Sequence, residues 1–291
     1  MRLSLVTPVL TCVPGSHARW EEAAGMAELV EIARTADRLG YHHLTCSEHV
    51  AIPTEVAKVR GATYWDPLAT FGYLAAVTER VRLATYVLVL GYHHPLEIAK
   101  RYGTLDLVSG GRLILGVGVG SLREEFELLD APFADRGARA DDALVALRAS
   151  LSQEQPVYHG THYDYGGVVV RPSAVQPRLP LWVGGRTRRS LRRAAALADG
   201  WAPFGVSVAQ VADWVAGVER PDGFEVVISP ERALDPSDAA SACTDALGAL
   251  AAAGTTIVAA RVVHHSLAHC LEQLEALAGL AATATTRQGA T

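Results

Sequence analysis

The sequence predicts a (β/α)8 TIM barrel of the α/β class. Three observations support this: apolar runs of strand length recur along the chain, helical patterns separate them, and eight such runs can be counted. Alternating strands and helices are typical of a parallel sheet, and eight units close most simply into a barrel, which needs about 250 residues. The chain has 291 residues. We therefore expect residues 1–281 to form a single barrel domain.

The expected strands are short and mostly apolar. They cover residues 3–8, 44–48, 81–90, 113–120, 181–184, 200–204, 224–229 and 256–262. The helices between them are expected at 21–39, 67–78, 95–109, 139–151, 188–198 and 237–253. Gly40 is a typical stop for the first helix, and Asp66 is a good amino-terminal cap for the second.

Two segments do not fit the alternation of strands and helices. Residues 157–175 are expected to form a small hairpin inserted between the fourth helix and the fifth strand. The segment 282–291 is small and polar, and we expect a disordered tail there.

Composition limits the possible partners. Hydrophobic residues make up 49% of the chain, yet no apolar run approaches the roughly 18 residues of a membrane span. The net charge of −5 and the pI near 6.1 argue against a nucleic-acid binder, which needs a basic face. The sequence therefore predicts a small-molecule substrate, with no nucleic acid and no membrane as partner.

The amino terminus and the cysteines indicate a cytoplasmic protein. Residues 1–10 could pass as a signal peptide, but Pro8 interrupts them and a first barrel strand explains them better. The four cysteines show no Cys-x-x-Cys spacing, so we expect reduced thiols.

Three His-His doublets, at 42–43, 93–94 and 264–265, are the candidate metal ligands. Adjacent residues on a strand point to opposite faces, so each doublet offers at most one inward ligand. We therefore predict no metal site.

A strand with alternate glycines is the strongest functional signal. Gly116, Gly118 and Gly120 remove the side chains from one face of the fourth expected strand. Glycine inside a strand often marks the close approach of a ligand or of another backbone. Two interpretations stay open: a flat or charged ligand lies against this face, which we favour, or the glycines relieve crowding between strands.

In such barrels the active site lies at the carboxyl ends of the strands. Glu48 and His49 end the second expected strand, so His49 is a candidate proton donor or orienting group. Alternatively, His49 only hydrogen-bonds the barrel rim, and Glu48 only pairs with an arginine.

A glycine turn begins the helix after the fifth strand. Gly184 and Gly185 are followed by Arg186, Arg188 and Arg189, and cations in a first turn oppose the helix dipole. A phosphate bound at the helix terminus explains this arrangement better than a solvated surface does. A phosphate here and a flat ring at the glycine strand would together describe a flavin or deazaflavin.

Several motifs in order carry a family resemblance. They are Glu48-His49, the strand at 85–90, His94-Pro95, the segment 104–120 and Leu181-Trp-Val-Gly-Gly. With them the chain resembles the bacterial luciferase-like family, most of all its deazaflavin-dependent branch, over residues 1–205. The resemblance implies a barrel that holds coenzyme F420, or alternatively FMN, and transfers a hydride at the central ring of the cofactor.

The resemblance also implies roles for individual residues around that cofactor. Glu48 and His49 would lie beside the ring, and Tyr86 and Val87 would form a bulge, often with a non-proline cis peptide, behind its reactive centre. The remaining implied contacts, near the pyrimidine side of the ring and at the phosphate, are Val119, Gly120 and Ser121, and Gly184, Gly185, Arg186 and Thr187.

Ser121 departs from one branch of the family. Sugar-phosphate dehydrogenases of this branch carry an acidic glutamate there, so we do not expect that reaction. Residues 51–61, with Tyr64 and Trp65, are a candidate lid over the cavity, although Trp65 could instead pack against the next helix. Paired barrels are usual among relatives, so a homodimer is expected.

Three other functions are alternatives to hydride transfer with F420. The first is an FMN-dependent monooxygenase that uses oxygen on the same barrel. The second is a nicotinamide dehydrogenase, but a fingerprint starting at Gly116 would place Ser121 where the third glycine belongs. The third is a flavin-binding barrel without catalytic activity.

Overall fold

Eight parallel strands pair in a closed ring in the computed structural model, which describes residues 1–288. Pairing of β10 with both β7 and β11, and of β13 with both β12 and β1, completes the ring. The predicted TIM barrel is confirmed. The ring consists of β1 (Arg2–Leu5), β3 (His43–Cys46), β5 (Arg82–Thr85), β7 (Leu113–Gly118), β10 (Leu181–Gly185), β11 (Gly200–Pro203), β12 (Glu225–Ile228) and β13 (Ile257–Ala260).

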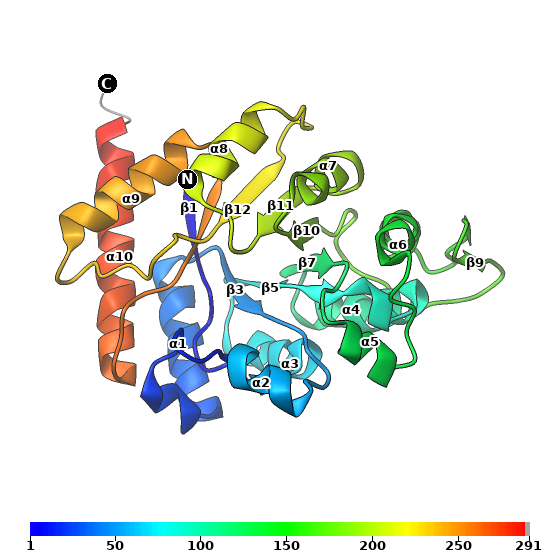
Figure 1. The fold of residues 1–291 in the computed structure, drawn as a ribbon, viewed down its shortest axis with the longest axis horizontal. Helices are drawn as coiled ribbons and strands as arrows, with labels where there is room; N and C mark the ends of the chain where they lie inside the picture. The colour runs from blue at the N-terminus through cyan, green and yellow to red at the C-terminus, as the bar shows by residue number, and fades with distance from the viewer. Residues whose placement is uncertain (289–291) are drawn as a thin grey trace.

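Helices surround the ring, and the last of them packs beside the first (Figure 1). Local signals set their ends: the Asp66 side chain accepts from the amide of Ala69, and Gly40 ends α1 with a φ of +78°. The long helices are α1 (Met26–Leu39), α3 (Pro67–Val77), α4 (Pro95–Val108), α6 (Arg136–Ser150), α7 (Arg188–Leu197), α8 (Val208–Ala216), α9 (Ala240–Ala252) and α10 (Leu267–Gln288).

Short elements lie between the barrel strands and the long helices. Two pairs are antiparallel: β2 with β4, and β8 with β9, the latter lying between α6 and β10 where the sequence predicts a hairpin. The short elements are β2 (Thr11–Cys12), η1 (Arg19–Glu22), α2 (Thr54–Arg60), β4 (Thr63–Tyr64), β6 (Leu88–Val89), η2 (Leu90–Tyr92), α5 (Arg123–Leu128), β8 (Tyr158–His159) and β9 (Asp164–Tyr165).

The core has two parts. The larger cluster of buried apolar side chains fills the space between the strands and the helices, and a smaller one fills the barrel interior. The interior cluster contains Ala84, Ile114, Trp182, Ala202, Val227, Ile257 and Ala259.

Two predicted boundaries are wrong. The first helix begins at Met26 rather than at residue 21, because the buried Glu21 carboxylate accepts from the amides of Val9 and Ala18 in a separate 3-10 turn. The third strand is two strands, β5 and β6, because the ladder is interrupted at Tyr86 and Val87: β5 pairs with β3 and β7, whereas β6 pairs with β7 further along. The peptide between Tyr86 and Val87 is cis.

Two long helices, α8 and α10, are missing from the prediction. The Ser207 side chain caps α8 by accepting from the amide of Gln210, which is a recognisable start signal. Helix α10 runs to Gln288 and so extends into the segment predicted as a disordered tail. Alanine-rich sequence has high helix propensity. Residues 289–291 lie outside the described residues.

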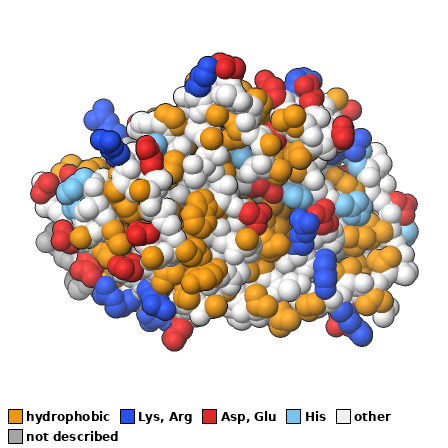
Figure 2. Space-filling view, turned by 90° about the horizontal axis from the view of Figure 1, so that it is seen from below, with side chains coloured by type: hydrophobic (Ala, Val, Ile, Leu, Met, Phe, Trp, Pro, Cys, Tyr) orange, Lys and Arg blue, Asp and Glu red, His pale blue; other side chains and the backbone are white. Residues whose placement is uncertain are grey.

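The surface mixes chemical types. Seen from below, side chains of both charges are interspersed with hydrophobic ones (Figure 2). Within residues 1–288, no helix combines the length and the hydropathy that a bilayer crossing requires. The four cysteines are buried free thiols.

Candidate active site

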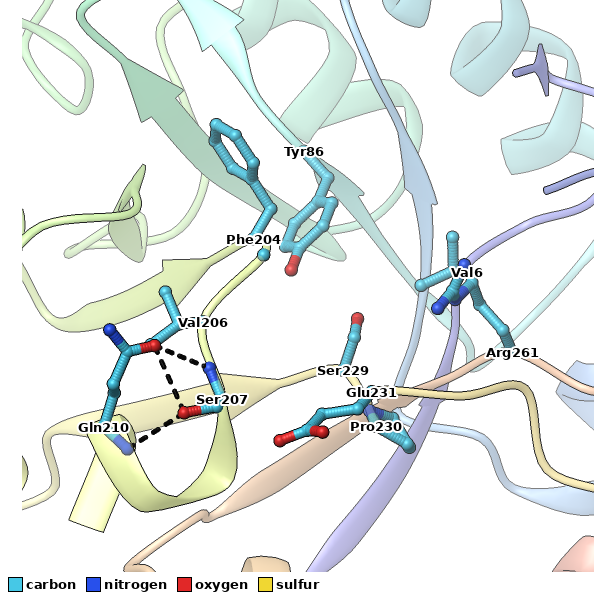
Figure 3. Close-up of a pocket in the computed structure, with 11 residues that line it drawn as sticks. Val6, Tyr86, Phe204, Val206, Ser207, Gln210, Ser229, Pro230, Glu231 and Arg261 are labelled. Carbon is cyan, nitrogen blue, oxygen red and sulfur yellow. Dashed lines mark hydrogen bonds between the residues drawn. The ribbon is translucent and has the colours of Figure 1, made fainter. Parts of the chain in front are cut away.

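A cavity of about 590 Å³, which we call the mouth cavity, opens at the carboxyl ends of the barrel strands. Its walls come from residues that follow β1, β5, β11, β12 and β13 (Figure 3). This is the end of the barrel at which the sequence places the active site. The lining residues discussed below are Val6, Tyr86, Phe204, Ser229, Glu231 and Arg261.

Tyr86 is the sequence-predicted site residue that lines the mouth cavity. Its phenol oxygen lies 2.7 Å from the carbonyl oxygen of Pro203, to which it donates. Burial raises the pKa of Tyr86 to about 12, although Ser229 and Arg261 beside it act to lower the pKa. The phenol therefore keeps its proton at neutral pH.

Val87 occupies the space between two glycines. A Cβ atom built on Gly118 would lie 2.6 Å from one methyl of Val87, and one built on Gly184 would lie 2.6 Å from the other. A Cβ on Gly116 would lie 2.1 Å from the carbonyl oxygen of Thr85. Gly118 and Gly184 therefore make room for the Val87 side chain, and Gly116 makes room for the backbone of β5.

Gly120, just after β7, also makes room for protein atoms. A Cβ there would lie 2.5 Å from the ring of Phe126 and 2.8 Å from a methyl of Val89. The interpretation that a flat ligand lies against the alternate glycines is wrong, because protein atoms fill that space. The alternative, crowding between neighbouring segments, is correct.

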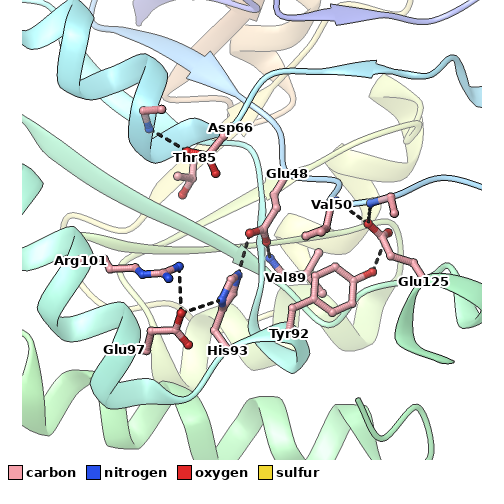
Figure 4. Close-up of polar contacts among 12 residues, drawn as sticks. Glu48, Val50, Asp66, Thr85, Val89, Tyr92, His93, Glu97, Arg101 and Glu125 are labelled. Atoms are coloured by element: carbon pink, nitrogen blue, oxygen red, sulfur yellow. Dashed lines mark hydrogen bonds and ion pairs between the residues drawn. The ribbon is translucent and has the colours of Figure 1, made fainter. Parts of the chain in front are cut away.

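Glu48 does not line the mouth cavity; its side chain lies near Asp66 and His93, where α3 and α4 begin (Figure 4). One carboxylate oxygen accepts from the Val89 amide at 2.7 Å, and the other lies 2.7 Å from His93 Nε2. Burial alone would lower the pKa of His93, but the bond to Glu48 raises it above the ordinary value. Both oxygens of Glu48 therefore fix the segment that follows the cis peptide.

His49 contacts the carboxylate of Glu125 in α5. Its Nδ1 lies 2.6 Å from Oε2 of Glu125, whose side chain is fully buried. The same carboxylate accepts from the phenol of Tyr92 at 2.8 Å and from the Val50 amide at 2.6 Å. Burial alone would raise the pKa of Glu125, but the bonds from His49 and Tyr92 hold it below its usual value. The ionised carboxylate therefore orients the His49 ring, with Nδ1 as the donor.

Glu125 and Tyr92 are not among the site residues predicted from the sequence. Glu125 lies in the helical turn just after β7, near the end of a barrel strand, and that position could have indicated it. Glu48 and His49, which were predicted as a pair, follow the end of β3 and have separate partners, His93 for Glu48 and Glu125 for His49.

The glycine turn lies close to the mouth cavity. The Thr187 side chain caps α7 by accepting from the Ser190 amide, and Gly185 has a φ of +115°. The guanidinium of Arg186 lies 5.9 Å from the ring centre of Phe204, which lines the cavity and is 45% exposed. Arg186 and Phe204 thus connect the turn to the cavity.

The residues at the end of β7 are packed or solvated rather than turned into the mouth cavity. Val119 packs against the large core cluster. The exposed Ser121 hydroxyl accepts from Arg60 of α2 at 3.4 Å. This contact links the end of β7 to the segment predicted as a lid.

The candidate lid contains α2, none of whose side chains is buried. The Tyr64 ring lies edge-on to the His49 ring, with their centres 4.5 Å apart. Trp65 packs against the large core cluster. Within the described residues, no group of three or more His, Cys, Asp or Glu side chains is arranged to hold a metal ion.

Comparison with known proteins gives one family. The model of the luciferase-like monooxygenases matches residues 7–242. An uncharacterized protein of Mycobacterium tuberculosis is 32% identical over 203 residues, which are 66% of this chain and 70% of that protein.

Other relatives carry named activities. The 4-hydroxyprotoasukamycin monooxygenase of Streptomyces nodosus is 31% identical over 62% of this chain and 43% of its own. The F420-dependent glucose-6-phosphate dehydrogenase of Microbacterium testaceum is 29% identical over 62% of this chain and 53% of its own.

The crystal structure of the monooxygenase RslO1 from Streptomyces bottropensis shares the fold. Its TM-score is 0.71 at 22% identity, and the match covers 96% of this chain and 98% of that one.

Proposed function

Because the chain belongs to the luciferase-like monooxygenase family, we propose that it is an oxidoreductase that transfers a hydride between coenzyme F420 and a small organic substrate. Relatives in sequence include a monooxygenase and an F420-dependent dehydrogenase, so this class of enzyme contains both chemistries. One observation carries the proposal: the mouth cavity meets the glycine turn through Phe204 and Arg186.

The residues present fit such a cofactor. The volume of about 590 Å³ lies in the usual range for a small-molecule site. At the amino terminus of α7, the first turn has no acidic residue, and a helix amino terminus favours an anion. Arg188 is already paired with Asp213, whereas Arg186 makes no ion pair with a described residue. Gly185, Arg186 and Thr187 would therefore hold the phosphate.

When bound, the cofactor would supply the ring that donates or accepts the hydride. His49 is the candidate proton donor or orienting group; Glu125 holds its Nδ1, so Nε2 would be the nitrogen to serve in that role, although His49 does not itself line the mouth cavity. Tyr86 keeps its proton and presents a neutral wall to the cavity. Glu48 acts as a positioning residue for the segment after the cis peptide, in place of the catalytic role expected from the sequence.

A second candidate function is an FMN-dependent monooxygenase. The named monooxygenase among the relatives favours it. In that case reduced FMN would support oxygen consumption by this protein, whereas F420 would not. An oxygen electrode separates the two functions.

The first test is titration of the apoprotein with F420 and, separately, with FMN, following the fluorescence of each cofactor. Binding of F420 alone supports the hydride-transferring oxidoreductase. Binding of FMN alone favours the monooxygenase, and binding of neither rejects the cofactor site.

Two variants locate the phosphate in the same titration. The R186Q variant should weaken binding by about tenfold, the effect of losing one charge-assisted bond. Arg192 lies further along α7 and is exposed, so R192Q should leave affinity unchanged. Equal affinities of the two variants would place the phosphate elsewhere. The homodimer and the cytoplasmic location stay predictions, the former checked by light scattering.

A further inference from the structure

The mouth cavity contains a cation that has no paired carboxylate. Arg261 lines the cavity directly after β13 and makes no ion pair with a described residue. Its backbone is fixed, because its carbonyl accepts from the Leu234 amide at 2.7 Å and the neighbouring Val262 bridges to Leu234. An arginine held in this way is available to a bound molecule.

The strand pattern directs this side chain into the mouth of the barrel. Ile257 and Ala259 of β13 belong to the cluster inside the barrel, so the next inward position is Arg261. On the neighbouring strand Leu5 is in register with Ala260, which places Val6 beside Arg261 (Figure 3). The guanidinium therefore lies at the cavity wall rather than among the helices.

The other charged group of the cavity does not neutralise Arg261. One carboxylate oxygen of Glu231 accepts from the Val208 amide at the start of α8, at 3.1 Å. In Figure 3 Glu231 extends toward Ser207, and Arg261 lies on the other side of Ser229. The cavity thus carries one positive and one negative group on separate walls.

The remaining wall is largely apolar. Val6 and Phe204 line the cavity, and Val206 is buried at its edge. An apolar body lying against these side chains would bring a polar end of the same molecule to Arg261. The planar guanidinium binds a carboxylate through two parallel hydrogen bonds.

We propose that the mouth cavity binds a substrate with a single carboxylate, which Arg261 holds while the apolar part lies against Phe204 and Val206. This inference rests on the proposed function and names the substrate class of the same site. A carboxylate fits better than a phosphate, because a dianion would add a second negative charge to a cavity that already contains Glu231.

The test uses three probes of similar shape: benzoate, its neutral analogue benzamide, and phenyl phosphate. Binding to the purified protein is measured by calorimetry, with no cofactor added. Benzoate should bind at least about tenfold more tightly than benzamide, because the neutral amide cannot form the charge-assisted hydrogen bonds that the carboxylate forms with Arg261. Phenyl phosphate should bind more weakly than benzoate.

Variants assign the effect to Arg261. R261Q should remove the preference for benzoate, and R261K, which keeps the charge but loses the planar fork, should retain part of it. E231Q should strengthen phenyl phosphate binding more than benzoate binding. Arg232 is exposed and does not line the cavity, so R232Q is the matched control and should match the wild type. Circular dichroism checks that each variant is folded.

Several results would overturn the proposal. It fails if wild-type protein binds benzoate no better than benzamide, if R261Q keeps the preference, or if phenyl phosphate binds most tightly. It also fails if R261Q weakens F420 or FMN binding as much as it weakens benzoate binding, because Arg261 would then serve the cofactor. Absence of cofactor binding in the wild type rejects the proposed function instead, and the benzoate measurement is independent of it.

Discussion

Replacing Gly118 with alanine should destabilise the protein before any cofactor is involved. The new Cβ would lie 2.6 Å from Cγ2 of Val87, closer than real Cβ contacts come. Val87 is β-branched and stiff about χ1, so its methyl cannot swing away freely. Overpacking of this kind costs about 1–3 kcal/mol.

The V87A variant tests the same contact from the other side. It removes two methyl groups, which is worth about 1.6 kcal/mol in transfer free energy and somewhat more with the cavity that is left. In the double variant V87A/G118A, the added methyl enters the emptied space. The loss in free energy of unfolding of the double variant should therefore be smaller, by about 1–2 kcal/mol, than the sum of the losses of the two single variants.

Urea unfolding of the apoprotein, followed by circular dichroism, gives each free energy of unfolding. The control is G72A in α3, where a Cβ would meet no atom within 4 Å. That variant should gain up to about 1 kcal/mol, because alanine is the better helix former.

Two results would refute the packing argument. In one, G118A unfolds at the same urea concentration as the wild type and loses only cofactor affinity. The space in front of Gly118 would then be filled by a ligand rather than by Val87. In the other, the two single effects add without coupling, so Val87 is not the group that meets the new methyl.

Two further predictions concern buried carboxylates. Because Glu48 raises the pKa of His93, the protonated pair should stabilise the fold at low pH by about 1 kcal/mol and lose this as pH rises through the raised pKa. Wild-type protein should therefore lose stability from pH 6 to pH 8 relative to H93Q in urea titrations, and parallel pH profiles would contradict this. E125A leaves the donors of His49, Tyr92 and Val50 unpaired and should cost at least about 3 kcal/mol at pH 7. The pKa of Glu125 is lowered, so its contribution is present above the unfolded pKa and lost as pH falls through the folded one. The stability gap between E125A and wild type should thus narrow as pH falls below the ordinary range of a glutamate carboxyl, and a gap that does not change with pH would disprove the assignment.

Local signals predicted most of the barrel. The apolar runs, the Asp66 cap and the Gly40 stop depend on residues close together in the chain, so a single sequence contains them. The break between β5 and β6 was lost inside one apolar run, because apolarity alone does not show where the backbone changes direction.

The site was harder to predict because its contacts join distant segments. His49 and Glu125 are separated by 76 positions, and no local pattern links them. The alternate glycines gave a correct signal of close approach, but a sequence does not show whether a ligand or Val87 is the neighbour. Arg261 lies beyond residue 205, where the family resemblance ended.

The pairing of β1 with β13 has a consequence for biosynthesis. Arg2 and Ile257 are neighbours in the sheet although 255 positions separate them. A ribosome releases the first strand long before the last one, so the nascent sheet has two open edges until β13 emerges. Unpaired edges attract other strands. Ring closure, a contact of very high sequence separation, therefore waits for the synthesis of β13 and is expected to be a slow step.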